Sequence, residues 1–171
     1  MFVSVRCYYV HIATPSYVAE RVSEDFADRL SERPGFIAYE FLDCGDGQAM
    51  SISVFEEAEQ AQDSRELARR WTAEHLPDVE LTITDSLHGP VIEHRSREGC
   101  ARWGSLRGHR KRTAASLADE VMGREDAVTC QVIDVGGGEL LTVGLYADPV
   151  SEPVGTGEIL VSRVTRLPAS S

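Results

Sequence analysis

The chain has 171 residues, of which 42% are hydrophobic and 26% charged, so its composition is that of a globular protein rather than a disordered or fibrous one. Its formal charge of -11 disfavours binding to nucleic acid or to an anionic membrane, because both need a basic surface. No apolar run approaches the about 18 residues of a membrane-spanning helix, and the N-terminus does not resemble a signal peptide. We therefore predict a cytoplasmic protein.

The first half of the chain alternates between strand and helix patterns. Period-two alternation predicts strands, and apolar residues at helical spacing predict helices. In chain order these are a strand over 2–10, a helix that begins at 14–16 and ends at 33–35, strands over 36–43 and 48–55, a helix over 56–76 and a strand over 88–94. The polar connection before the last strand admits a short extra strand over 79–83. The order β-α-β-β-α-β is that of a ferredoxin-like, split βαβ unit.

A polar segment at 95–99 is a natural linker, and related patterns follow it. These are a strand over 100–106, a helix over 113–122, and strands over 127–134, 139–146 and 158–164. An offset of 91 residues places the turn 43–47 on 134–138, with the same Asp-x-Gly-x-Gly pattern. At the last strand the offset falls to 68, and the 23 residues lost match the second helix with its connection.

These offsets predict an α+β protein of two tandem ferredoxin-like units with antiparallel sheets. The first unit, 1–95, is complete, and the second, 96–171, is degenerate and lacks its second helix. Each sheet has one face without helices, which another sheet must cover. The two units could pair within one chain, as a compact pseudo-dimer, or between chains. Because the shortened unit leaves sheet uncovered, we expect a homodimer. A small apolar ligand would enter between sheet and helices or between the sheets.

Common catalytic and metal-binding motifs are missing from the sequence. It contains no GxSxG, P-loop, Rossmann or HExxH pattern. The four cysteines form no CxxC pair and no cluster with histidine at zinc spacing, which also predicts no disulfide framework in a cytosolic protein. We therefore expect no metal and no cofactor.

Four features of the first 95 residues resemble one known family. They are Pro34-Gly35-Phe36 before the second strand, the turn 43–47, the strand 50–55 and the helix ending in Trp71-Thr72-Ala73-Glu74-His75-Leu76. Together they are similar to the antibiotic-biosynthesis monooxygenase family of the dimeric α/β-barrel superfamily. The resemblance implies that ferredoxin-like units pair into a barrel.

Activities differ within that family. Some members oxidise aromatic polyketides or quinols without metal or flavin, others degrade haem, and many have no assigned activity. Haem-degrading members use an asparagine in the first strand and a distant Trp/His pair. This chain contains no asparagine, and its Trp71 and His75 are only four residues apart, which argues against haem degradation. Cofactor-free members also often place asparagine near the substrate, so its absence weakens that assignment too.

Trp71 and His75 lie one helical turn apart and therefore share a face. They could form an aromatic wall with a proton acceptor. The alternative, which we favour, is a core tryptophan beside a histidine that interacts with the last carbonyls of its helix.

Tyr8 and Tyr9 point to opposite faces of the first strand, which His11 ends, and Tyr39 is expected on a neighbouring strand. A Tyr–His pair could deprotonate a phenolic substrate, although such tyrosines are more often packing residues.

Two functional hypotheses follow. The first is a cofactor-independent monooxygenase-like protein that acts on a small aromatic or quinone-type metabolite. Its catalytic candidates are His75, His11 and Tyr39, and its substrate-binding candidates are Trp71, Tyr9 and Phe55. The second is a non-catalytic protein of the same fold that binds a small ligand or a partner subunit. The absence of asparagine and the degenerate second half favour the second hypothesis, since fold alone does not establish catalysis.

Overall fold

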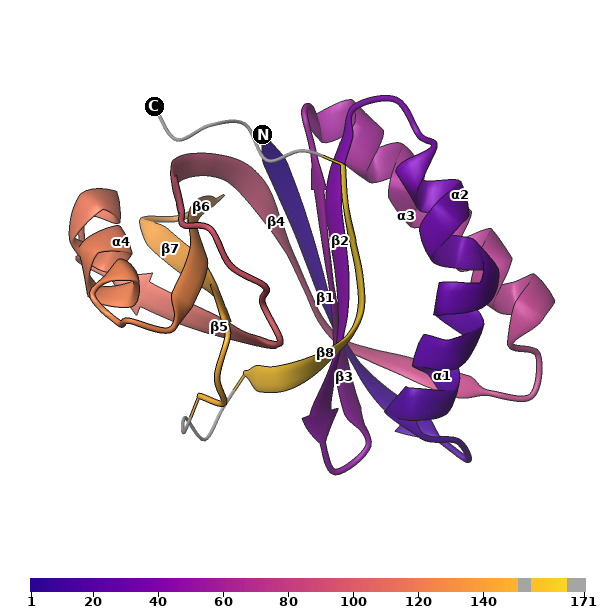
Figure 1. The fold of residues 1–171 in the computed structure, drawn as a ribbon. Helices are drawn as coiled ribbons and strands as arrows, with labels where there is room; N and C mark the ends of the chain where they lie inside the picture. Colours follow the sequence, from indigo (N-terminus) through magenta and orange to yellow (C-terminus); the bar gives the residue numbers. More distant parts are fainter. Residues whose placement is uncertain (151–154, 166–171) are drawn as a thin grey trace.

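The computed structural model describes residues 1–150 and 155–165 (Figure 1). In the first half the elements are β1 (Phe2–His11), α1 (Pro15–Arg21), the π-helical turn η1 (Val22–Phe26), α2 (Ala27–Ser31), β2 (Phe36–Gly45), β3 (Gln48–Phe55), α3 (Ala58–His75) and β4 (Glu80–Ser96). In the second half they are β5 (Trp103–Arg110), α4 (Ala114–Met122), β6 (Ala127–Gly136), β7 (Glu139–Tyr146) and β8 (Thr156–Val164). No helix in this part of the chain is both long enough and apolar enough to cross a membrane.

The segments α1, η1 and α2 follow one another without a break. Thr14 caps the first of them, because its hydroxyl oxygen accepts a hydrogen bond from the Tyr17 amide at 3.2 Å, and Pro15 takes the first helical position. Gly35 turns the chain into β2 with a positive φ of 71°. A side chain at Gly35 would collide with Gln60 of α3, so this glycine also allows the two helical regions to approach each other.

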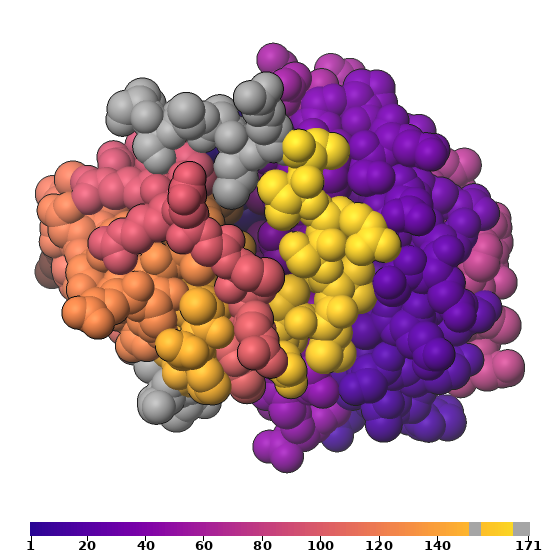
Figure 2. All heavy atoms as spheres, viewed as in Figure 1, coloured from indigo at the N-terminus to yellow at the C-terminus, as the bar shows by residue number. Residues whose placement is uncertain are grey.

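The eight strands of the described residues belong to one antiparallel sheet that closes on itself as a barrel, in the order β1-β3-β2-β8-β5-β7-β6-β4. The two halves of one chain therefore complete the sheet without a second copy. The longest strand, β4, joins the halves: its first part pairs with β1 and its last residues, Val91–Ser96, pair with β6. Figure 2 shows β8 lying between the first half and the rest of the second half.

The pairing registers of the two halves repeat at constant offsets. An offset of 91 carries β2–β3 onto β6–β7, so that the pair Phe36↔Phe55 becomes Ala127↔Tyr146. Two irregularities in β2–β3, at 36/38 and 43/45, recur at 127/129 and 134/136 in β6–β7. The pairing β1–β4 also has a counterpart: offsets of 101 for β1 and 68 for β4 carry the pair Phe2↔Pro90 onto Trp103↔Glu158 of β5–β8. The pairing β4–β6 matches β8–β2 in the same way, because the pair Ser96↔Thr129 corresponds to Val164↔Ala38.

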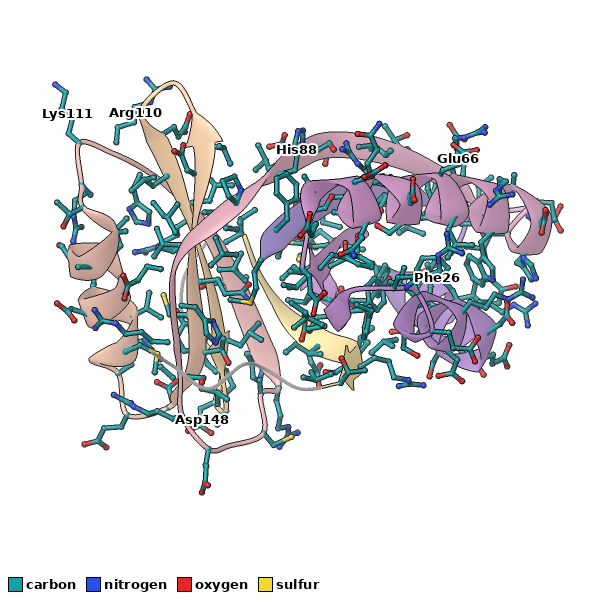
Figure 3. The ribbon with its side chains drawn as sticks, turned by 90° about the horizontal axis from the view of Figure 1, so that it is seen from above. Phe26, Glu66, His88, Arg110, Lys111 and Asp148 are labelled. Carbon is teal, nitrogen blue, oxygen red and sulfur yellow. The ribbon has the colours of Figure 1, made fainter. Side chains whose placement is uncertain are left out.

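Apolar side chains form three clusters in layers. One fills the inside of the closed sheet and includes Val5, Ile52 and Val143. A second lies between α1, η1, α2 and α3 and the outer face of the first half, and a third lies between α4 and β6–β7. Seen from above (Figure 3), α3 and the α1–α2 segment lie on one side of the sheet and α4 lies on the other. Any site beneath the helices is therefore on the outer face of the sheet.

Several strand boundaries differ from the sequence predictions. The strand predicted over 88–94 is the second part of β4, which also includes the stretch 80–83. The predicted linker at 95–99 begins inside β4, and β5 starts at Trp103 rather than at residue 100. The reason is pairing: Arg95 and Ser96 find partners on β6, whereas sequence alternation alone cannot reveal a partner strand.

Candidate functional site

A cavity of about 610 Å³ lies between the helices of the first half and the outer face of its sheet. Alternate residues of β1, namely Ser4, Arg6 and Tyr8, point into it, because successive side chains of a strand face opposite ways. Tyr39 and Phe41 of β2 extend this floor, and the helices form the roof. Figure 3 places Phe26 between α3 and the α1–α2 segment, and Glu66 on the outer side of α3.

One wall of the cavity is aromatic. The ring of Phe26 lies edge-on to Tyr39, with centroids 5.7 Å apart, and 5.2 Å from the ring of Trp71. Tyr39 and Trp71 each line the cavity and are each 4% exposed. These separations are those of favourable aromatic pairs, so the three rings form a continuous surface on which a planar ligand can pack.

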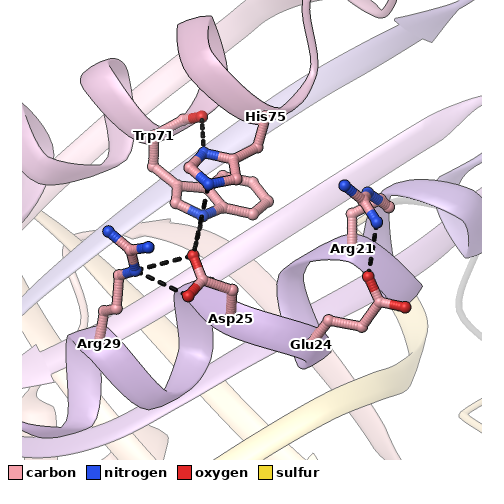
Figure 4. Close-up of polar contacts among 6 residues, drawn as sticks. All are labelled: Arg21, Glu24, Asp25, Arg29, Trp71 and His75. Carbon is pink, nitrogen blue, oxygen red and sulfur yellow. Dashed lines mark hydrogen bonds and ion pairs between the residues drawn. The ribbon is translucent and has the colours of Figure 1, made fainter.

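A polar clamp holds Trp71 from behind (Figure 4). The indole Nε1 donates a hydrogen bond of 2.7 Å to Asp25, which also accepts one of 2.8 Å from Arg29. The hydrogen bond from Arg29 is the main reason that the pKa of Asp25 lies below its usual value, and the hydrogen bond from Trp71 is the second. Asp25 belongs to the π-helical turn η1, a type of turn that is frequent at functional sites.

His75 belongs to the same clamp. Its ring stacks on Trp71 at 5.0 Å with an interplanar angle of 7°, and its Nδ1 lies 3.1 Å from the Trp71 carbonyl oxygen. Because a carbonyl can only accept, Nδ1 carries the proton, and Nε2 faces Asp25 at 3.7 Å. His75 therefore supports the outer side of the aromatic wall and is not among the residues that line the cavity.

The floor of the cavity offers polar groups. The hydroxyl groups of Tyr8 and Ser51 lie 3.2 Å apart. Burial raises the pKa of Tyr39 well above its usual value. Tyr8 and Glu40 raise this pKa further, whereas the charge of Arg6 lowers it. Tyr39 thus stays protonated at neutral pH and acts as a hydrogen-bond donor. Within the described residues, its hydroxyl has no hydrogen-bond partner.

The predicted site residues fall into three places. Tyr39 and Trp71 line the cavity, and His75 backs it. Tyr9 is 41% exposed and lies on the other face of β1, where its ring contacts His11 at 4.7 Å. His11 Nε2 lies 3.1 Å from the Thr82 hydroxyl.

Phe55 is fully buried and packs edge-on against Phe36. Neither Phe55, Tyr9 nor His11 is among the lining residues. The structure therefore brings only Tyr39 and Trp71 together in one cavity.

Sequence reasoning did not single out Arg6, Ser51 or Arg65, and it chose Tyr9 as a substrate-binding candidate, whereas Tyr8 is the tyrosine of β1 that lines the cavity. The signal available was the polar series Ser4, Arg6, Tyr8 on one face of β1, which reads as a face exposed to water. In the folded chain the helices cover that face, so the polar series becomes the cavity floor. Among the described residues, no group of three or more His, Cys, Asp or Glu side chains could hold a metal ion.

Solved structures with the same fold are named as oxidising enzymes. A candidate monooxygenase from Fusobacterium nucleatum superposes with a TM-score of 0.69 at 9% identity, covering 96% of this chain and 94% of its own. An anthrone oxidase-like protein has a TM-score of 0.52 at 8% identity, with coverages of 99% and 96%. A candidate monooxygenase from Lactobacillus acidophilus has a TM-score of 0.51 at 10% identity, covering 86% and 78%.

Sequence comparisons add nothing to this likeness: no protein-family model matches the chain, and no curated protein does. At such low identities, the structural likeness establishes a shared α+β fold with an antiparallel eight-stranded sheet.

Proposed function

We propose that this chain is a monooxygenase-like protein that binds a small aromatic or quinone-type molecule in the cavity beneath α3. The observation that carries the proposal is the cavity itself, about 610 Å³ in volume, with Tyr39, Phe26 and Trp71 along one wall. This volume lies in the usual range of small-molecule sites. The names of the similar structures support the same reaction class.

The reaction we propose needs no cofactor. A ring CH₂ group reacts with O₂, one oxygen atom becomes the new carbonyl oxygen, and the other leaves as water with the two hydrogens. The substrate supplies all four electrons that reduce O₂, so no other reductant enters the balance. Tyr39 hydrogen-bonds the substrate oxygen, and Trp71 packs against its ring. His75 acts as a positioning residue behind Trp71, and Tyr9, His11 and Phe55 make no contact with the substrate.

We further propose that residues 1–95 and 96–171 are tandem ferredoxin-like units, the second without its second helix. The offsets of 91, 101 and 68 support this, because all three carry strand pairs of one half onto pairs of the other. The turns agree as well: Asp43 accepts from the Gly45 amide at 2.9 Å, and Asp134 from the Gly136 amide at 2.8 Å. Because the sheet closes within one chain, the predicted homodimer would form through other surfaces. Native mass spectrometry of the purified protein tests whether two chains associate.

Oxygen uptake with anthrone tests the enzymatic proposal. A solution of anthrone in excess should consume O₂ faster when the protein is present than when it is absent. When the gas is ¹⁸O₂, one carbonyl oxygen of the product should carry the label. The variant Ala49→Leu is the control, because Ala49 is a small residue of the cavity lining and leucine would fill the space. A rate that does not rise above the protein-free rate, or that Ala49→Leu leaves unchanged, would contradict the proposal.

One observation favours the non-catalytic alternative. No histidine lines the cavity among the described residues, and the single carboxylate that does, Glu66, is exposed and pairs with Arg69 at 2.7 Å. The cavity therefore supplies hydrogen-bond donors and cations rather than a general base. Tight binding of an aromatic ligand without oxygen uptake would assign the chain to small-ligand binding instead.

A further inference from the structure

We infer that the ligand of this cavity is an aromatic anion whose negatively charged oxygen, a carboxylate or phenolate, binds to Arg6. This inference deepens the proposed function and rests on the cavity being the aromatic site. It names the charge of the ligand, which neither the fold nor the similar structures supply.

Arg6 is a cation that has no ion-pair partner in the described part of an acidic chain. The chain carries 28 acidic residues against 17 basic ones, and many of its arginines form ion pairs, among them Arg29, Arg95 and Arg112. Arg6 lines the cavity floor and makes no ion pair within the described residues. A charge in such a partly buried place is stabilised when an opposite charge approaches, so an anionic ligand would complete it.

Other groups of the cavity match an anion as well. Tyr39 is close enough to Arg6 for the guanidinium to influence its hydroxyl, and this hydroxyl has no hydrogen-bond partner among the described residues. Arg65 of α3 also lines the cavity, and its Nε is buried without a partner. The Arg6 guanidinium, the Tyr39 hydroxyl and the Arg65 Nε are therefore three donors at this surface that a charged oxygen could engage.

The second half of the chain provides an internal comparison. Arg6 faces Ser51 across β1–β3, and Arg107 faces Thr142 at the equivalent place in β5–β7. There the chain supplies its own anion, because Glu120 of α4 lies 4.0 Å from Arg107. The equivalent cation is thus neutralised within the protein in the second half and left for a ligand in the first.

Calorimetric titration with 2-naphthoate and with the uncharged 2-naphthamide tests the inference on the wild-type protein. We expect 2-naphthoate to bind at least about tenfold more tightly, because a charge-assisted pair with arginine is available only to the acid. Equal affinities would overturn the inference and leave the aromatic site intact. Binding of neither compound would overturn the proposed function itself.

Variants locate the anion contact. Arg6→Gln should lower the affinity for 2-naphthoate about tenfold and leave that for 2-naphthamide unchanged, whereas Arg6→Lys should keep most of the preference. Arg110→Gln, which removes an exposed arginine that pairs with Glu139 in the second half and does not line the cavity, is the matched control and should change neither. An equal loss for both compounds in Arg6→Gln, with a native circular dichroism spectrum, would show a packing role and overturn the inference.

A phenol distinguishes the two kinds of anion. When 2-naphthol binds at pH 7.5, Arg6 should favour its ionised form, and the absorbance of naphtholate should appear only with protein. Its appearance, and its loss in Arg6→Gln, would assign a phenolate ligand. Tight binding of 2-naphthoate without naphtholate absorbance would assign a carboxylate.

Discussion

The two halves of the chain share a strand framework but differ in what lies on it. At equivalent places on the outer faces, Ser4, Arg6, Tyr8 and Ser51 of the first half correspond to Ser105, Arg107, His109 and Thr142 of the second. Even a side-chain contact recurs: the Tyr8 hydroxyl lies 3.2 Å from Ser51, and His109 Nε2 lies 3.0 Å from the Thr142 hydroxyl. The polar residues that form the cavity floor in the first half therefore have counterparts at the same strand positions in the second half.

Only the first half surrounds this floor with two helical regions. Its α3 has 18 residues and supplies Trp71, whereas the second half has no counterpart of α3 among the described residues. The nine-residue α4 packs Leu117 and Met122 directly onto β6–β7, and Leu140 stands where the first half has Ala49. The difference teaches that strand register sets which residues face outward, and that the second helix makes a cavity above them.

The largest effect is expected from removing Trp71, which belongs to the aromatic wall of the first half. Trp71→Ala should lower the free energy of unfolding by about 3–5 kcal/mol, because it deletes a large buried ring and leaves Asp25 without its indole donor. Urea unfolding followed by circular dichroism measures the loss. Trp103→Ala, at a half-buried tryptophan of the second half, is the control and should cost clearly less. Equal losses would contradict the distinct role given to α3.

A buried carboxyl provides the next comparison. Glu40 is 3% exposed, and burial raises its pKa to about 8, whereas its counterpart at the 91-residue offset is the uncharged Gln131. Because the folded-state pKa exceeds the unfolded value, the protonated form stabilises the fold below about pH 4.5, and that stability is lost as pH rises toward 8.

Glu40→Gln should abolish this dependence and make the two halves alike. The wild type should lose about 3 kcal/mol of unfolding free energy between pH 5 and pH 8, and the variant should lose little of it. Urea unfolding at both pH values measures the difference. The conservative variant Gln131→Glu should introduce a similar pH dependence in the second half. A flat profile for the wild type would exclude a buried, ionisable Glu40.

The two glycine turns should respond equally. Gly45 and Gly136 have φ values of 82° and 87°, and a Cβ at either position would meet nothing within 4 Å. Alanine at each should therefore cost only the backbone strain, about 1 kcal/mol, and the same amount in both halves. Thermal unfolding of the two single variants checks this. A clear inequality would mean that the turns are not equivalent, contrary to the proposed duplication.

The smallest effect is expected at the clamp of the first half, in which Asp25 binds Arg29 and Trp71. Because Arg29 and Trp71 hold the pKa of Asp25 low, the ionised form stabilises the fold above the unfolded pKa, and this contribution is lost as pH falls below about 3.8. The Asp25 side chain is 35% exposed, so screening by solvent keeps the effect small. Acid unfolding followed by tryptophan fluorescence should begin at a lower pH in the wild type than in Asp25→Asn, because the variant lacks the stabilisation by the ionised carboxylate at every pH. Identical acid midpoints of the two proteins would show that the ionised Asp25 carboxylate does not stabilise the fold.

The sequence by itself determined the order of the elements. Period-two and helical spacing located strands and helices because each buries one face, and the Asp-x-Gly-x-Gly turns were readable because glycine accepts positive φ. The offset of 91 residues was also readable, and the pairing registers of β2–β3 and β6–β7 agree with it. All of these are local properties or comparisons of one segment with another.

Only the tertiary structure decided where the site lies. Whether the polar face of β1 meets water or helices depends on how α3 packs, and this choice makes Arg6 and Tyr8 lining residues while leaving Tyr9 and His11 outside. The continuous β4 and the closure of the sheet within one chain depend on pairings between residues far apart in sequence. Such long-range contacts leave no periodic signal in either partner alone, because periodicity reports which face is buried and not what buries it.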